Sequence, residues 1–181
     1  MARRRYDPDR RQRIIDAAIR VVGERGIDGL SHRAVAAAAD VPLGSTTYHF
    51  ATLDDLLVAA LRQVCVEPQA ALEDWRRHLE GSGLPLADRL AALLEEAMAG
   101  DRSRIRIEYE LYLAALRRDA LRPVAAEWLD GVAGILNDHT KDASTAHALI
   151  ALIDGLLLQL LLTGRPFDRA EVRQALARVI G

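Results

Sequence analysis

Apolar residues recur every three to four positions along almost the whole chain, and this helical spacing is the feature that most restricts its fold. No stretch shows the alternation of apolar and polar residues that a half-buried strand needs. Half of the 181 residues are apolar, and only 12 glycines and 6 prolines interrupt the pattern. The sequence therefore predicts an all-α protein that is long enough to bury a sizeable core.

Breaks in this spacing divide the chain into about nine helices in two parts. Residues 1–51 are expected to form a head of three helices, and residues 52–181 a larger helical body. A long fourth helix joins the two parts, and Pro68 is expected to kink or split it because proline removes a backbone donor. The Gly81–Gly83 segment is expected to end that helix.

The head has the sequence marks of a helix-turn-helix. Its first helix covers about residues 9–25, and Ser31 is a suitable N-cap for the second. Asp40 occupies a position that requires a left-handed backbone, and Pro42 suits the start of a third helix. Thr52 is followed three residues later by an acid, as in a capping box. Two short helices behind a longer one are the helix-turn-helix arrangement.

Charge is distributed unevenly along the chain, although the net charge is only −2. Residues 1–50 hold nine arginines and six acids, which gives +3, and the remaining residues carry −5. Any contact with nucleic acid is therefore expected from the N-terminal part. A solvated arginine-rich tail is the alternative interpretation of the same charges.

Several classes of protein are disfavoured by what the chain contains. The single cysteine, Cys65, excludes an internal disulfide framework, and the five histidines lack the spacing of metal ligands, so neither metal nor cofactor is expected. No apolar segment follows the basic N-terminus, which argues against a secretory signal. The longest apolar run, residues 148–162, is shorter than the roughly 20 residues that span a membrane. A soluble cytoplasmic protein without membrane contact is expected.

Residues 40–57, DVPLGSTTYHFATLDDLL, allow two functional interpretations. Ser45 and His49 are one helical turn apart and could pair as nucleophile and base, but no strand-to-helix elbow or oxyanion-hole pattern accompanies them. An enzyme is therefore the weaker interpretation. As a recognition helix in the major groove, the same segment places short hydroxyls at base edges, and Tyr48 and His49 can donate to phosphates.

The predicted DNA contacts combine this segment with basic and capping residues nearby. They are Arg3, Arg4, Arg5, Ser31, Arg33, Leu43, Gly44, Ser45, Thr46, Thr47, Tyr48, His49 and Thr52. Phe50, at the end of the third helix, is expected to fill the core of the head. The basic N-terminus can neutralise backbone charge or enter a minor groove.

Matching positions across three helices link residues 9–61 to a known family. They include Val35-Ala36, Val41, Gly44-Ser45, Tyr48-His49-Phe50 and Asp55-Leu56-Leu57, in family order and spacing. This segment resembles the N-terminal domain of the TetR family of bacterial transcription regulators. The resemblance implies a homodimer that binds a palindromic DNA operator, usually as a repressor. It also implies a body that binds a small molecule and moves the two heads apart.

The chain departs from the family pattern at three places. Asp40 replaces the usual glycine of the turn, and Thr47 replaces a second aromatic residue. Leu53 stands where the family commonly has a lysine that holds a phosphate. The N-terminal arginines, Thr52 or the start of the fourth helix are the candidates for that lost contact.

The eighth helix, about residues 142–163, is apolar on nearly every side. One amphipathic face needs fewer apolar residues, so two buried faces are expected, one toward the core and one toward a second copy. With the last helix it would form a four-helix interface, although a fully central core helix is the alternative. The predicted interface residues are Leu149, Ile153, Leu156, Leu157, Leu160, Leu161, Val172, Leu176 and Val179.

Ligand pockets in helical bundles are mostly apolar with a few polar groups. The candidates in the body are Trp75, Met98, Glu108, Tyr109, Tyr112, Trp128 and Asp154, all of which could equally be core. Asp154 needs a partner within its apolar helix, and a structural role ranks above a ligand contact. The leading hypothesis is a DNA-binding repressor released by a small molecule. The alternative is an all-helical small-molecule-binding protein or enzyme whose head is non-functional.

Overall fold

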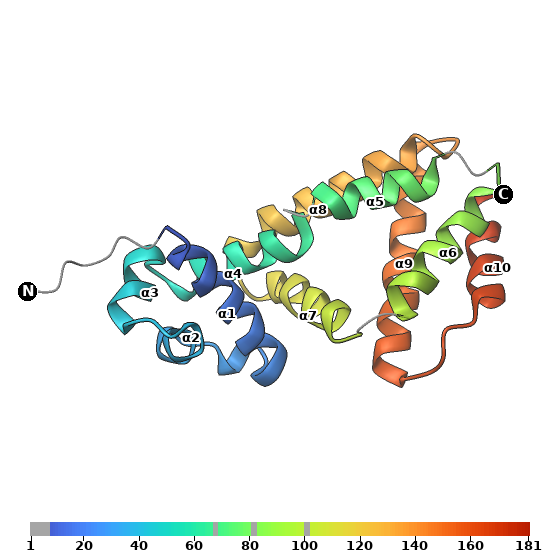
Figure 1. Cartoon of the computed structure of the whole chain (residues 1–181). Coiled ribbons are helices and arrows are strands. Elements are labelled where there is room, and N and C mark those ends of the chain that lie inside the picture. Colours follow the sequence, from blue (N-terminus) through green and yellow to red (C-terminus); the bar gives the residue numbers. More distant parts are fainter. Residues whose placement is uncertain (1–7, 67–68, 81–82, 100–101) are drawn as a thin grey trace, which may run out of the picture.

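The computed structural model describes residues 8–66, 69–80, 83–99 and 102–181, and this part of the chain is helical without strands (Figure 1). The α-helices are α1 (Arg10–Arg25), α2 (His32–Ala39), α3 (Leu43–His49), α4 (Leu53–Leu61), α5 (Gln69–Leu79), α6 (Leu86–Ala99), α7 (Arg102–Leu113), α8 (Arg122–Asn137), α9 (Ala143–Thr163) and α10 (Arg169–Ile180). Single 3₁₀ turns cover Ile27–Gly29, Ala114–Leu116 and Asp119–Leu121, and a π-helical turn covers Arg62–Val66. The all-α prediction is confirmed.

Local signals set the helix boundaries of the head as the sequence predicted. The Ser31 hydroxyl accepts a hydrogen bond from the Ala34 N–H at 3.1 Å and caps α2. Asp40 ends α2 in the left-handed region, with φ of 53°. At the start of α4 the capping box is complete, because the Asp55 N–H donates to the Thr52 hydroxyl and the Thr52 N–H donates to the Asp55 carboxylate.

The long fourth helix is two helices. α4 ends at Leu61, the π-helical turn follows, and α5 begins at Gln69, which gives ten α-helices in the described residues where about nine were expected. Pro68, the predicted cause of this interruption, and residues 81–82 of the predicted Gly81–Gly83 break lie outside the described residues. Further along, Asp142 caps α9, and Gly164 ends it in the left-handed region.

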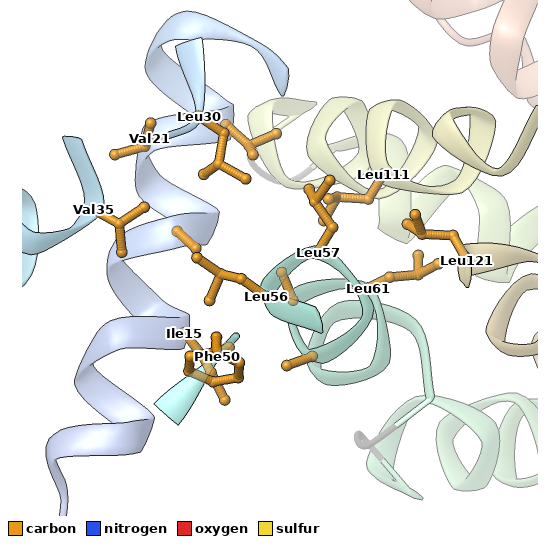
Figure 2. Packing of buried hydrophobic residues seen from close by; sticks show 14 of the residues in the cluster. Ile15, Val21, Leu30, Val35, Phe50, Leu56, Leu57, Leu61, Leu111 and Leu121 are labelled. Atoms are coloured by element: carbon orange, nitrogen blue, oxygen red, sulfur yellow. The ribbon is translucent and has the colours of Figure 1, made fainter. Parts of the chain in front are cut away.

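The core of the head continues into the body. Phe50 is 3% exposed and packs beside Ile15 of α1 and Leu56 of α4, as expected for a core residue (Figure 2). The same apolar cluster extends through Leu57 to Leu121, so α4 and the chain around residues 111–125 share it. The head and the body are thus joined by apolar packing as well as by the covalent connection through α4. The division into residues 1–51 and 52–181 stays a proposal, and this cluster crosses it.

A second apolar cluster fills the body. It is formed mainly by α6, α8, α9 and α10, with α10 packed against both α6 and α9 at the end farthest from the head (Figure 1). Trp128 of α8 contacts both clusters and so lies between them.

α9 combines great apolarity with incomplete burial. Its 21 residues make it the one helix of the described chain long and apolar enough to cross a membrane by length and composition, with a mean hydropathy of 1.9. The apolar run considered in the sequence was shorter than this whole helix. In the fold α9 packs on α7, α8 and α10, but only 22% of its most apolar window is buried. Much of one face of α9 is consequently uncovered in the single chain.

Candidate functional site

The recognition helix α3 presents one side to solvent. Leu43 is 45% and Tyr48 84% exposed, and Gly44 and Thr47 are also exposed. The ring of Tyr48 lies edge-on to that of His49, with centroids 5.2 Å apart, and His49 is half-buried. An exposed phenol beside a glycine and a threonine can contact base edges and phosphates in a groove. Ser45 is half-buried, so a smaller fraction of it is accessible to DNA than of Thr47 or Tyr48.

Thr46 differs from the prediction. Its side chain is 0% exposed, and its hydroxyl donates to the Leu43 carbonyl at 2.8 Å. Because this hydroxyl faces the interior of the head, base readout by Thr46 is not compatible with the structure. The neighbouring Thr47 is exposed, and its hydroxyl makes only a long contact of 3.4 Å to the Gly44 carbonyl. Of these two threonines, only Thr47 therefore remains a candidate for reading DNA bases.

Three other predicted DNA contacts lie on the helices that flank α3 in the chain. Ser31 and Thr52 are exposed at the starts of α2 and α4, but both hydroxyls accept backbone N–H groups as caps. Arg33 is exposed on the first turn of α2. Arg3, Arg4 and Arg5 lie outside the described residues. The structure thus assembles the predicted surface from α2, α3 and the start of α4.

A cavity of about 170 Å³ lies in the body between the π-helical turn and helices α5 to α9. Most of its wall is apolar, and its polar side chains come mainly from α7. The lining residues are Val64, Cys65, Trp75, Leu93, Leu94, Ala97, Ile105, Glu108, Tyr109, Tyr112, Trp128, Leu129, Val132, Ile150, Ile153, Asp154 and Leu157. Six of the seven predicted ligand residues are therefore brought together here.

Met98 is the exception among the predicted ligand residues. It is 2% exposed and packs within the second apolar cluster, away from the cavity wall. Its neighbour one turn earlier, Leu94, lines the cavity instead. Both residues lie on one face of α6, so their position along the helix axis separates them. The sequence alone does not show where along α6 the cavity lies.

Two carboxyl groups enter the cavity. The Tyr109 hydroxyl donates to Asp154 Oδ1 at 2.9 Å, and Arg104 Nε pairs with Glu108 Oε1 at 3.1 Å. Burial raises the pKa of Asp154, against a smaller opposing effect of the Tyr109 hydrogen bond. Burial likewise raises the pKa of Glu108, with Arg104 opposing it. No lysine, arginine or histidine lines the cavity within the described chain, so its polar groups favour a cation or a hydrogen-bond donor.

Cys65 is a lining residue that sequence reasoning missed. Burial, reinforced by the nearby Glu108 charge, raises the pKa of its thiol to about 12. The thiol therefore stays protonated at neutral pH and acts as a small apolar wall group. No neighbouring sequence signal marks it as part of a cavity.

The predicted dimer residues divide by burial. Leu149, Ile153, Leu157, Val172 and Leu176 are each at most 9% exposed within the single chain, and Ile153 and Leu157 line the cavity. These five are core residues of the protomer and have little surface to offer a partner. Leu156, Leu160, Leu161 and Val179 are half-buried.

α7 also contacts the head, which the sequence did not indicate. The Ile27 N–H, just after α1, donates to Glu110 Oε1 at 2.7 Å. At Gly23 an added Cβ would lie 2.7 Å from Ile107 Cδ1, so α1 and α7 approach too closely for any larger residue without a shift. Arg118, following α7, pairs with Asp54 of α4. Residues of α7 on one side line the cavity, and residues on the other side hold α1.

Neither catalytic nor metal chemistry gains support from these contacts. No hydrogen bond joins Ser45 to His49, and within the described part of the chain no three His, Cys, Asp or Glu side chains gather as metal ligands. A three-helix head with an exposed recognition helix, docked on a helical body that contains a mostly apolar cavity, defines a helix-turn-helix regulator with a ligand site.

The comparisons with known proteins agree with this class. Residues 14–60 match the family described as bacterial regulatory proteins, tetR family, and residues 82–181 match the tetracyclin repressor-like C-terminal domain. The chain belongs to the TetR family. It is a ligand-responsive DNA-binding transcriptional regulator, from a family of regulators rather than of enzymes.

Relatives and solved structures cover nearly the whole chain. The multidrug binding protein EbrR complexed with ethidium is 59% identical, covers 97% of this chain and 100% of its own, and has a TM-score of 0.87. The nicotine-responsive transcriptional repressor HdnoR of Paenarthrobacter nicotinovorans is 29% identical over 83% of both chains. The regulator BetI of Burkholderia mallei is 31% identical over 88% of this chain and 85% of its own.

Proposed function

We propose that this protein is a cytoplasmic, homodimeric repressor that leaves a palindromic operator when a cationic, planar aromatic ligand fills the body cavity. The observation that carries the proposal is a cavity walled by aromatic and aliphatic side chains, with two carboxyl groups and no lining cation among the described residues. Trp75, Trp128 and the tyrosines can stack on a flat ring or a cation.

Solved structures of a similar protein support this ligand class. EbrR, at 59% identity, has been crystallised with ethidium, proflavin and malachite green. In this chain Asp154 is placed to neutralise such a ligand, because a buried carboxylate without a cation is costly and gains from pairing. Glu108, which already pairs with Arg104, adds a second negative charge at the cavity wall. HdnoR, whose name describes a nicotine-responsive repressor, supports repression as the mode of regulation.

The size of the cavity supports a coupled movement. Its volume of about 170 Å³ is below the ~300–1,000 Å³ of typical sites for drug-sized ligands. A ligand of several fused rings must therefore push the walls apart. α7 is a wall through Ile105, Glu108 and Tyr109, and the same helix touches α1 through Ile107 and Glu110. Outward movement of α7 consequently displaces the head.

Movement of the head matters because operator half-sites are fixed in space. Two recognition helices must enter successive major grooves about 34 Å apart on one face of DNA. A shift of a few ångströms in the separation of two heads removes that match. Ligand binding and operator binding thereby oppose each other through one shared element.

Uncovered apolar surface on α9 supports the homodimer. Ala148 and Ala151 are exposed, Leu162 is 82% exposed, and a Cβ at Gly155 would meet no atom within 4 Å. These four positions recur at helical spacing on one face, opposite the buried Ile153. Small residues on an open face allow a partner helix to approach closely, as in a four-helix interface.

The proposal is tested by titrating ethidium into the purified protein and into its complex with operator DNA. Tight binding to the free protein and release of the operator at matching ethidium concentrations are expected. Asp154→Asn is expected to weaken ethidium binding about tenfold, whereas Asp138→Asn, an exposed change on the same body, leaves it unchanged. Binding that is equal in wild type and Asp154→Asn, or that leaves the operator complex intact, would contradict the proposal.

The competing hypothesis, a carrier or enzyme with a non-functional head, is separated by a gel-shift assay on the DNA upstream of the gene. Specific binding that weakens steeply with salt supports the regulator. Absence of any specific binding from a randomised DNA pool would favour the alternative.

A further inference from the structure

The start of α4 is a poor phosphate site on its own. Leu53 occupies the place of an expected lysine and packs partly buried against the head core. The next two residues are acids: Asp54 pairs with Arg118, and Asp55 turns back to accept the Thr52 N–H at 2.9 Å. Two carboxylates in the first turn oppose the binding of a phosphate that a helix N-terminus otherwise favours. A cation from elsewhere is needed there.

Arg11 supplies a cation at this place. Its guanidinium carbon lies 5.2 Å from the centroid of the Phe50 ring, and Phe50 stands between the end of α3 at His49 and the cap of α4 at Thr52. Figure 2 shows Phe50 against the first half of α1, beside Ile15. The Arg11 side chain is itself exposed. It therefore reaches from α1 across the junction of α3 and α4.

The contact with Phe50 fixes the guanidinium without neutralising it. No carboxylate of the described chain pairs with Arg11, whereas Arg20 on the same helix donates to the Ala38 carbonyl. Arg10 and Arg13 each have an interaction within the chain. A cation held over an aromatic face keeps its outward N–H groups available and loses less freedom on binding an anion.

We propose that Arg11 binds the operator phosphate next to the start of α4 and so replaces the lysine that is absent at position 53. The proposal rests on the DNA-binding function of the head, and it selects Arg11 from the N-terminal arginines that the sequence left as candidates for this contact. Since phosphate contacts position a protein without reading sequence, Arg11 adds affinity equally for every DNA sequence.

The test is the salt dependence of binding to a duplex selected with wild-type protein from a randomised pool. Arg11→Gln is expected to make the slope of log affinity against log salt shallower by about 1.8, from about 0.9 per phosphate in each of two heads. Selection with the variant is expected to return the same consensus. Arg25→Gln removes the same charge about 21 Å away at the other end of α1 and is expected to leave the slope unchanged.

A rescue distinguishes a phosphate contact from a structural role. Leu53→Lys added to Arg11→Gln is expected to restore the wild-type slope, because it returns a cation to the same place from another helix. A wild-type slope in Arg11→Gln, or failure of Leu53→Lys to restore it while the melting temperature is unchanged, would overturn the proposal. A steep dependence of wild-type affinity on salt supports the DNA-binding function, whether or not the Arg11→Gln variant changes that dependence.

Discussion

At the scale of single residues, Asp154 and Thr46 show how burial assigns roles that residue type leaves open. The sequence favoured a structural role for Asp154, and in the fold its carboxyl accepts the Tyr109 hydroxyl at the wall of a cavity. Thr46 looked like a readout group, and its side chain is 0% exposed. Both side chains are polar, yet one faces an empty space and the other the packed interior of the head.

Asp154→Asn is expected to stabilise the protein at neutral pH while weakening its ligand. Burial raises the pKa of Asp154 in the folded state, so the folded protein holds this proton more tightly than the unfolded chain does. Wild-type stability therefore falls as pH rises from the unfolded value through the folded one. Asparagine lacks this titration and still accepts the Tyr109 hydroxyl. Thermal unfolding between pH 3 and pH 8 tests this prediction. The melting temperature of Asp154→Asn should exceed that of wild type at pH 7.

The affinity for a cationic dye is expected to fall on acidification, beginning at a higher pH than ordinary carboxyl groups would give. Both Asp154 and Glu108 have raised pKa values, and their protonation removes the charges that attract the ligand. Ethidium fluorescence titrations from pH 4 to pH 8 measure this. An affinity independent of pH over that range would rule out a role for these carboxylates.

Thr46→Ala and Thr47→Ala are expected to separate folding from readout. Thr46→Ala removes a buried hydrogen bond to the Leu43 carbonyl, at a cost of about 1–2 kcal/mol in the free energy of unfolding, and leaves the operator consensus unchanged. Thr47→Ala on the exposed side is expected to keep stability and change the consensus. Chemical denaturation and randomised-site selection measure the two effects. An altered consensus in Thr46→Ala would contradict the assignment.

At the scale of helices, the ends that carry local sequence signals were predictable, whereas the packing partners of each helix were not. Caps such as Ser31 and Thr52 act through neighbours within four residues, so the sequence is sufficient for them. The break between α4 and α5 was expected from Pro68, whereas the two contacts of α7 with α1 depend on partners far apart in the sequence. The cavity was predictable only as a set of residue types: Met98 and Leu94 differ by one turn of α6, and tertiary packing chose the second.

Glu110→Ala is expected to uncouple ligand binding from operator release. The substitution removes the acceptor of the Ile27 N–H while leaving the lining residues of α7 in place. Ethidium affinity should change less than twofold, and the ethidium concentration for half-release of the operator should rise about tenfold, equal to ~1.4 kcal/mol of coupling. Gel shifts with added ethidium test this, and Glu96→Gln on exposed α6 surface is the control. Unchanged release would mean that another contact carries the movement.

At the scale of the whole molecule, α9 shows why an apolar helix is ambiguous from sequence. The sequence predicted two apolar faces on α9. The predicted interface residues, however, combined residues of the buried face with residues that keep some exposed surface. Leu149 and Ile153 belong to the core, whereas Leu162 with Ala148 and Ala151 remains open. The rotation of α9 about its axis, set by α8 and α10, makes that distinction.

Leu162→Arg is expected to give a monomer at micromolar concentration, because it places a charge on the open face of α9. Leu116→Arg changes another exposed leucine, which is 75% exposed on the 3₁₀ turn after α7, and is expected to remain dimeric. Sedimentation velocity compares the two with wild type. A Leu162→Arg protein that sediments as a dimer would place the interface elsewhere. Ile153→Arg is a poorer probe, since Ile153 is 4% exposed and its replacement damages the core.

The two sides of α7 have a consequence for what this regulator measures. Under the proposed mechanism, a helix that is both a wall of a small cavity and a contact of the head would respond to any occupant that fills the space, in whatever orientation it lies. Such a sensor reports the volume and charge of its occupant more than its identity. Chemically unrelated compounds would then elicit one common transcriptional output, and a small cation that fits without displacing α7 would act as a silent competitor.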